Sequence, residues 1–121
     1  MKIDRFEDIE TWKEARELVK SVYAVSRECR DFGYKDQIQR ASISVMSNIA
    51  EGFDRGTNKE FVQFLVIARG STSEVKSLAY AGMDVGHLKP EAFEALTTRC
   101  TSVSNMINGF IRYLSNTERK K

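Results

Sequence analysis

The 121-residue chain has little of what builds covalent or metal-held scaffolds. It contains one His, two Cys and one Pro. A single histidine excludes any site that needs two from one chain, and two cysteines cannot build a four-thiolate zinc module or a dense disulfide scaffold. The net charge of +2 is too small to indicate nucleic-acid or membrane binding by itself. The longest apolar run, residues 64–68, is far shorter than the roughly 18 residues of a membrane span.

What is present is typical of one globular domain, 1–121. Hydrophobic residues make up 41% and charged residues 30% of the chain. The segment Met1 to Asp8 has no apolar run, so we expect no secretory leader and a cytoplasmic, reduced setting. Cys29 and Cys100 fall on apolar helical stripes. We expect buried free thiols there, with a disulfide or a reactive site as the alternative.

Apolar residues recur at spacings of three and four, which predicts helices throughout. The predicted helices span about 8–30, 35–54, 58–85 and 90–116. Thr57-Asn58-Lys59-Glu60 has the pattern of a capping box, and Pro90 suits the first position of a helix. No segment alternates as a strand would. Short connections between four helices predict an all-α, antiparallel up-down-up-down four-helix bundle.

Small residues mark two of these segments. The second carries many Ala, Ser and Gly residues, which allow neighbouring backbones to approach closely. Gly70 and Gly82 lie inside the third, where each costs about 1 kcal/mol relative to alanine. This cost indicates close packing contacts at both glycines, with glycines that are merely tolerated there as the alternative.

Polar residues on the second and third segments form a candidate patch. Asn48, Glu51 and Arg55 follow helical spacing, and Arg40 lies two turns earlier. Arg69 and Glu74 lie on the next segment. One interpretation is an interface or ligand site. The favoured one is a hydrogen-bond and ion-pair network that fixes two helices or two subunits.

Basic residues gather toward the C-terminus. Residues 89–121 carry six basic and three acidic side chains. We call four of the basic residues the basic rim: Arg112, Arg119, Lys120 and Lys121. Cations at a helix C-terminus complement its dipole, which is the simpler explanation. The alternative is a phosphate-binding surface, whose charge an oligomer would multiply.

No enzymatic site can be assembled from the sequence. Asp84 and His87 form a single Asp-x-x-His at a helix end, whereas di-iron bundles repeat such a motif on two helices. We expect a solvated or capping histidine, and no catalytic residue, cofactor or metal. The aromatic residues expected to be exposed, some of them for subunit contacts, are Phe6, Trp12, Phe32, Tyr34 and Tyr80.

The run QIQRASISVMSNIAEG, residues 37–52, resembles the 23S rRNA intervening-sequence protein family. Matches at 6–9, 12–13, 60–61, 64–65 and 67–71 extend the resemblance over most of the chain. One position differs, because Gln39-Arg40 stands where the family often has two basic residues. The resemblance implies a four-helix bundle that assembles as a homopentameric ring and has no known enzymatic activity. A related branch, the accessory variability determinants of diversity-generating retroelements, binds a reverse transcriptase and nucleic acid.

Two functions remain open at this point. The first is a non-enzymatic homo-oligomeric scaffold or adaptor, in which replacing Asn48 or Gly70 should disturb assembly. The alternative is an RNA- or DNA-binding accessory protein that acts with rRNA or a reverse transcriptase through the basic rim.

Overall fold

The computed structural model describes residues 2–117 as a short 3-10 turn followed by four long helices. The elements are η1 (Phe6–Asp8), α1 (Glu10–Ser26), α2 (Phe32–Asp54), α3 (Asn58–Asp84) and α4 (Pro90–Ser115). No strand occurs among the described residues. The predicted all-α class with four helices is therefore confirmed.

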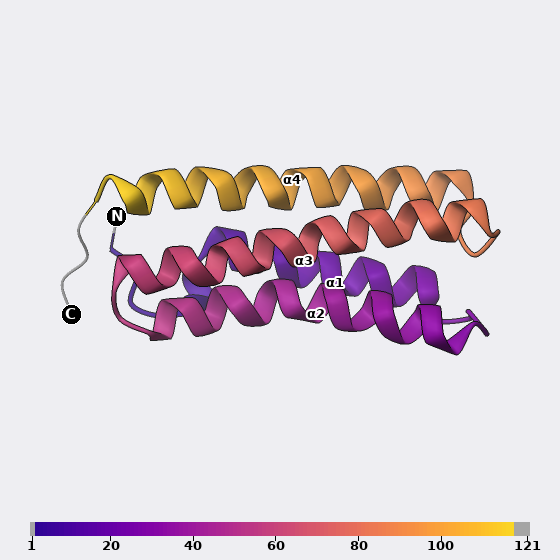
Figure 1. Cartoon of the computed structure of the whole chain (residues 1–121), viewed down its shortest axis with the longest axis horizontal. Helices are drawn as coiled ribbons and strands as arrows, with labels where there is room; N and C mark the ends of the chain where they lie inside the picture. The colour runs from indigo at the N-terminus through magenta and orange to yellow at the C-terminus, as the bar shows by residue number, and fades with distance from the viewer. Residues whose placement is uncertain (1, 118–121) are drawn as a thin grey trace.

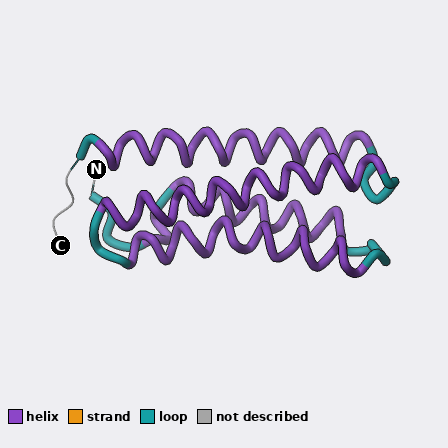
Figure 2. The backbone as a smooth tube through the Cα atoms, in the orientation of Figure 1, coloured by secondary structure: helices purple, strands orange, loops and turns teal. Residues whose placement is uncertain are grey.

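The helices lie side by side along the long axis of the molecule (Figure 1). The turns from α1 to α2 and from α3 to α4 lie at one end, which we call the far end. The turn from α2 to α3 lies at the other end, together with the N-terminus. Figure 2 shows loops only at these two ends of the helices. Helix α1 packs against α2 and α4, and α3 packs against the same two helices.

All four helices contribute to one apolar core, which includes Leu18, Ile38, Leu65 and Leu96. Phe61 lies near the turn between α2 and α3. Its ring meets Phe53 and Phe110 edge-on, with ring centroids 6.0 and 5.1 Å apart. Edge-to-face pairs of this kind add to the stabilisation that burial provides. Among residues 2–117, no helix combines the length and the apolar character needed to cross a membrane.

The first two helices begin or end at residues other than those predicted. Helix α1 ends at Ser26, four residues early, where the Ser26 hydroxyl donates to the Val22 carbonyl at 2.7 Å. Helix α2 begins at Phe32, three residues early, because the Asp31 carboxylate accepts from the Tyr34 amide at 3.2 Å and caps the helix. Gly33 lies in the first turn of this helix.

The two predicted helix starts further along the chain are confirmed. The Thr57 hydroxyl accepts from the Glu60 amide at 3.3 Å and donates to the Glu60 carboxylate at 3.1 Å. Gly56, immediately before this cap, has φ of 96°, which a glycine adopts without strain. Pro90 is the first residue of α4.

Glycines hold α2 and α3 close together at both ends of the pair. A Cβ on Gly82 would collide with the Tyr34 hydroxyl, so the predicted contact there is confirmed. A Cβ on Gly52 would lie 2.6 Å from the Phe64 Cβ. The corresponding prediction for Gly70 is wrong within the chain. Gly70 is exposed, and a Cβ there would meet nothing within 4 Å.

Several other predictions of exposure and burial need correction. Trp12 is buried, and Phe6 packs half-buried against it with ring centroids 5.2 Å apart. Tyr34 is also half-buried. Phe32 and Tyr80 are exposed, at 70% and 54%. Both cysteines are free thiols, and Cys100 is buried, but Cys29 is only half-buried because α1 ends before it.

Candidate functional site

The contact between α2 and α3, which we call the α2/α3 seam, holds several of the predicted polar residues. The Asn48 amide donates to the Ser44 carbonyl at 2.8 Å and to the Ser44 hydroxyl at 3.0 Å. That hydroxyl lies 2.8 Å from the hydroxyl of Ser71 on α3. Asn48 thus belongs to a small neutral network that joins the two helices.

Two more of the predicted residues make their contacts within the same pair of helices. The Arg55 guanidinium lies over the Phe64 ring, 4.8 Å from its centroid. The Glu74 carboxylate accepts from the Gln37 amide at 3.4 Å. Arg40 forms an exposed ion pair with Asp36 on its own helix at 3.3 Å. Glu51 is exposed on α2.

Arg69 is separated from this group. Its guanidinium donates to the Asn108 side-chain oxygen at 2.9 Å, on the side of α3 that faces α4. The same side carries Lys76, whose ammonium donates to the Thr101 hydroxyl at 3.1 Å. The structure therefore divides the six predicted residues, leaving Arg69 in the contact between α3 and α4, which we call the α3/α4 seam.

A polar hollow of about 150 Å³ lies in the α3/α4 seam. It is lined by Thr72, Ser73, Lys76, Cys100, Thr101, Ser104 and Asn105. We call it the α3/α4 hollow. Helices α3 and α4 run in opposite directions here, since residue 76 bonds to 101 and residue 69 to 108. The Lys76–Thr101 and Arg69–Asn108 hydrogen bonds therefore lie on opposite sides of the residues around Ser73 and Ser104.

No carboxylate lines this hollow. Arg69 and Lys76 are both half-buried, and each donates to a neutral oxygen. Burial raises the pKa of the Cys100 thiol to about 11, with a smaller opposing effect from the charge on Lys76. Cys100 is therefore a neutral thiol at physiological pH, and the hollow carries positive charge.

At the far end, His87 joins two turns of the chain. Its Nε2 lies 2.9 Å from the Asp31 carboxylate, and its ring lies 5.0 Å from the Tyr34 ring. The hydrogen bond to His87, and then that from the Tyr34 amide, lowers the pKa of Asp31. The backbone amide of His87 also caps α3 through the Gly82 carbonyl at 2.7 Å. The histidine caps as expected, but its side chain is held by Asp31.

The exposed surface of α3 is almost without charge between its first and last turns, although Lys59 and Asp84 are exposed at its two ends. Between residues 61 and 83 only one exposed side chain, Glu74, is charged. We call these exposed residues the outer stripe of α3: Gln63, Val66, Ile67, Gly70, Ser73, Glu74, Ser77, Tyr80, Ala81 and Met83. Ile67 is 51% exposed and Val66 43% exposed. By contrast, four of the six exposed residues of α1 are charged: Glu10, Lys13, Arg16 and Lys20.

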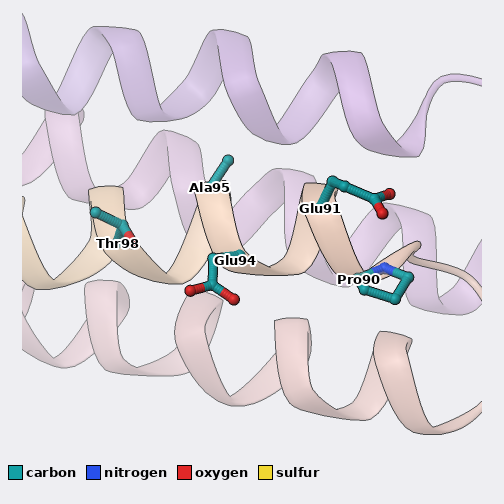
Figure 3. A pocket seen from close by; sticks show the side chains of 5 residues that line it. All are labelled: Pro90, Glu91, Glu94, Ala95 and Thr98. Carbon is teal, nitrogen blue, oxygen red and sulfur yellow. The ribbon is translucent and has the colours of Figure 1, made fainter.

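A larger and more open hollow of about 600 Å³ lies along the start of α4. Figure 3 shows Pro90, Glu91, Glu94, Ala95 and Thr98 lining it. The Glu91 and Glu94 carboxylates point away from one another rather than toward a common point. A pair of carboxylates that acts on one ligand must converge on it, so this surface offers no such site.

Of the basic rim, the structure describes only Arg112, which is exposed in the last turn of α4. Arg119, Lys120 and Lys121 lie outside the described residues. Within residues 2–117, no three His, Cys, Asp or Glu side chains form a group that could hold a metal ion.

The comparisons with known proteins agree with the motif in α2. The sequence profile of the family described as "23S rRNA-intervening sequence protein" matches residues 7–109, most of the chain. The chain belongs to this family.

A crystal structure of another protein supports the fold of this intervening-sequence protein. It is described as a protein with unknown function from the S23 ribosomal protein family of Bacteroides thetaiotaomicron. The TM-score is 0.78 at 19% sequence identity, over 84% of this chain and 98% of the other. At this identity the likeness shows the fold alone. No match was found among curated proteins.

The sequence of this family member did not point to every residue of the α3/α4 seam, because that seam depends on how α3 and α4 lie relative to one another. Lys76, Thr101 and Asn108 were not singled out. Arg69 and Lys76 are seven residues apart, which places both cations on one face of a helix. That signal was available, but the partners on α4 depend on how the two helices align.

Proposed function

We propose that the protein is a non-enzymatic homo-oligomeric scaffold, an antiparallel up-down-up-down bundle that assembles as a homopentameric ring. One observation carries this proposal, the nearly uncharged outer stripe of α3. The alternation of turns between the two ends in Figure 1 supports the order of the helices. The number five comes from the family resemblance.

The outer stripe has the composition of a covered surface. Charged residues are depleted at the centres of protein interfaces, while aromatic residues and methionine are enriched. The stripe carries Val66, Ile67, Tyr80 and Met83 but only one charge. The exposed face of α1 has the opposite composition, since four of its six exposed residues are charged.

Gly70 supports the same assignment. A glycine inside an exposed helix costs about 1 kcal/mol relative to alanine. Within one chain nothing lies where its Cβ would be, so close packing inside the chain gives no reason for it. A neighbouring subunit that approaches the backbone at Gly70 would give one.

The experiment is to measure the mass in solution by size-exclusion chromatography with light scattering. The unaltered protein should have a mass near five times its 13.8 kDa chain. Gly70→Glu should reduce it to that of one chain, because the new charge would be buried at the interface. The same substitution favours helix α3 in a lone chain, so loss of folding does not explain a lower mass.

Ala24→Glu is the matched control, since Ala24 is exposed on α1 and the change adds the same charge. It should leave the mass unchanged. A monomeric unaltered protein would contradict the scaffold. If Gly70→Glu keeps the full mass, the outer stripe is not the interface.

A second candidate function is the RNA- or DNA-binding accessory protein, acting with rRNA or a reverse transcriptase. The observation that favours it is the positive charge of the α3/α4 hollow rather than the basic rim. Its test is binding that weakens steeply as salt is raised.

A further inference from the structure

The α3/α4 hollow has the features of a site for an anion. Lys76 lines it, and a second cation of α3, Arg69, lies one turn before the lining residue Ser73. The two cations are seven residues and thus about 10 Å apart along the axis. Each is held by a neutral group on the opposite helix, Lys76 by Thr101 and Arg69 by Asn108. The hollow lies between these two hydrogen bonds.

The electrostatic environment of these cations differs from that of Arg99, the half-buried cation of α4. A partly desolvated charge is normally compensated by an opposite charge. Arg99, which is half-buried on the side of α4 toward α1, has the Glu14 carboxylate at 3.5 Å. Arg69 and Lys76 have no carboxylate within ion-pair distance among the described residues. An anion between them would supply the missing charge.

The remaining lining groups can donate hydrogen bonds to such an anion. The Ser73 and Ser104 hydroxyls and the Asn105 amide make no side-chain hydrogen bond within the described part of the chain. A cavity of about 150 Å³ admits a benzene molecule in another protein, and a phosphate group is smaller.

The geometry points to a phosphate-binding site in the α3/α4 hollow, with Arg69 and Lys76 as its charged ligands. Ser73, Ser104 and Asn105 donate to the remaining oxygens. Guanidinium and ammonium groups make charge-assisted hydrogen bonds to phosphate, which are stronger than those they make to neutral oxygens. Arg69 and Lys76 therefore exchange Asn108 and Thr101 for the phosphate. The site is formed by one chain and rests neither on the assembly nor on the nucleic-acid alternative proposed above.

The test compares two double variants that remove the same charge. Arg69→Gln with Lys76→Gln removes the cations of the hollow. Lys13→Gln with Lys20→Gln removes two exposed cations of α1 that pair with Glu10 and Glu17. Light scattering of all proteins shows whether the mass is preserved, so that loss of binding is separated from loss of assembly.

Two probes distinguish the source of the phosphate group. The first is inorganic phosphate, compared with chloride at equal ionic strength. It should raise the Tm of the unaltered protein and of the α1 double variant, but not that of the hollow double variant. The second is a short fluorescent oligouridylate, followed by anisotropy at about 50 mM salt. Losing two phosphate contacts should weaken its binding about tenfold and reduce the salt slope by about 1.4.

A response to inorganic phosphate alone identifies a small phosphate ligand, and dependence of the oligonucleotide on the hollow identifies a strand. Should the hollow double variant fail to fold, Ser104→Asp places a carboxylate among intact cations and should abolish the same responses. If neither probe separates the hollow variants from the α1 double variant, the site does not exist.

Discussion

Helix α3 meets α2 and α4 through seams of opposite construction. Toward α2 the contacting residues are small. Gly52 lies under Phe64, Gly82 lies under Tyr34, and Ser44 and Ser71 bond directly between them. Toward α4 they are long: Arg69 and Lys76 reach across to polar groups, and Tyr80 meets Phe93 with ring centroids 4.8 Å apart.

The difference shows that side-chain size determines how the two sides of α3 pack. Small residues let backbones approach, so the polar groups of the α2/α3 seam are satisfied by one another, as buried polar groups must be. In the α3/α4 seam the long residues reach neutral polar groups of α4, and a hollow of about 150 Å³ lies beside them. We infer that the first seam serves the fold and the second serves a ligand.

The largest effect should come from one substitution made at two glycines. Gly52→Ala places a Cβ 2.6 Å from the Phe64 Cβ and should lower the free energy of unfolding by about 2 kcal/mol. Gly70→Ala meets nothing within its own chain, so in a lone chain it should raise this free energy by up to about 1 kcal/mol. Urea denaturation at one protein concentration measures both. Equal stabilities would show that α2 and α3 are not in close contact at Gly52.

Glycines of α3 also show how much of the fold could be predicted from the sequence. Helical periodicity, the Thr57 cap and Pro90 are local patterns, and each predicted the element found. Gly70 and Gly82 look alike in sequence, yet only Gly82 faces a neighbouring helix. The Asp31 cap was a local signal that was missed. The α3/α4 hollow depends on how residues 69–76 align with residues 101–108, and no local sequence pattern predicts that alignment.

The next effect tests the far end of the α2/α3 seam. The Tyr34 hydroxyl donates to the Leu78 carbonyl at 2.6 Å, and burial raises the pKa of Tyr34 to about 12, so it remains a donor. Tyr34→Phe should cost about 1–2 kcal/mol in unfolding free energy. Tyr80→Phe, at an exposed hydroxyl, should cost less than about 0.5 kcal/mol. Equal losses in the two variants would count against the hydrogen bond.

A smaller effect should appear only in acid. The pKa of Asp31 in the folded protein is lowered from its ordinary 3.8, chiefly by the hydrogen bond to His87. Its contribution to stability is therefore present above about pH 4 and is lost as the pH falls through the folded value. Asp31→Asn keeps a good N-cap residue but removes the charge. The Tm difference from the unaltered protein should thus shrink between about pH 6 and pH 3.

Asp36→Asn is the control, because it removes a carboxylate that pairs with Arg40 on its own helix rather than across the far end. His87→Gln should reduce the acid dependence that Asp31 causes. An unchanged acid profile in both Asp31→Asn and His87→Gln would show that the pairing across the far end contributes nothing.

The smallest effect on stability gives the sharpest test of the two seams. Asn108→Asp gives Arg69 a carboxylate in place of an amide. The charge of Arg69 is then paired within the α3/α4 seam. The new half-buried pair should add less than about 1 kcal/mol to the free energy of unfolding. Because Arg69 is then neutralised, inorganic phosphate should no longer raise the Tm. Asn116→Asp adds the same charge at the exposed C-cap of α4 and should keep the response. If Asn108→Asp responds to phosphate as the unaltered protein does, Arg69 is not a ligand and both seams serve the fold alone.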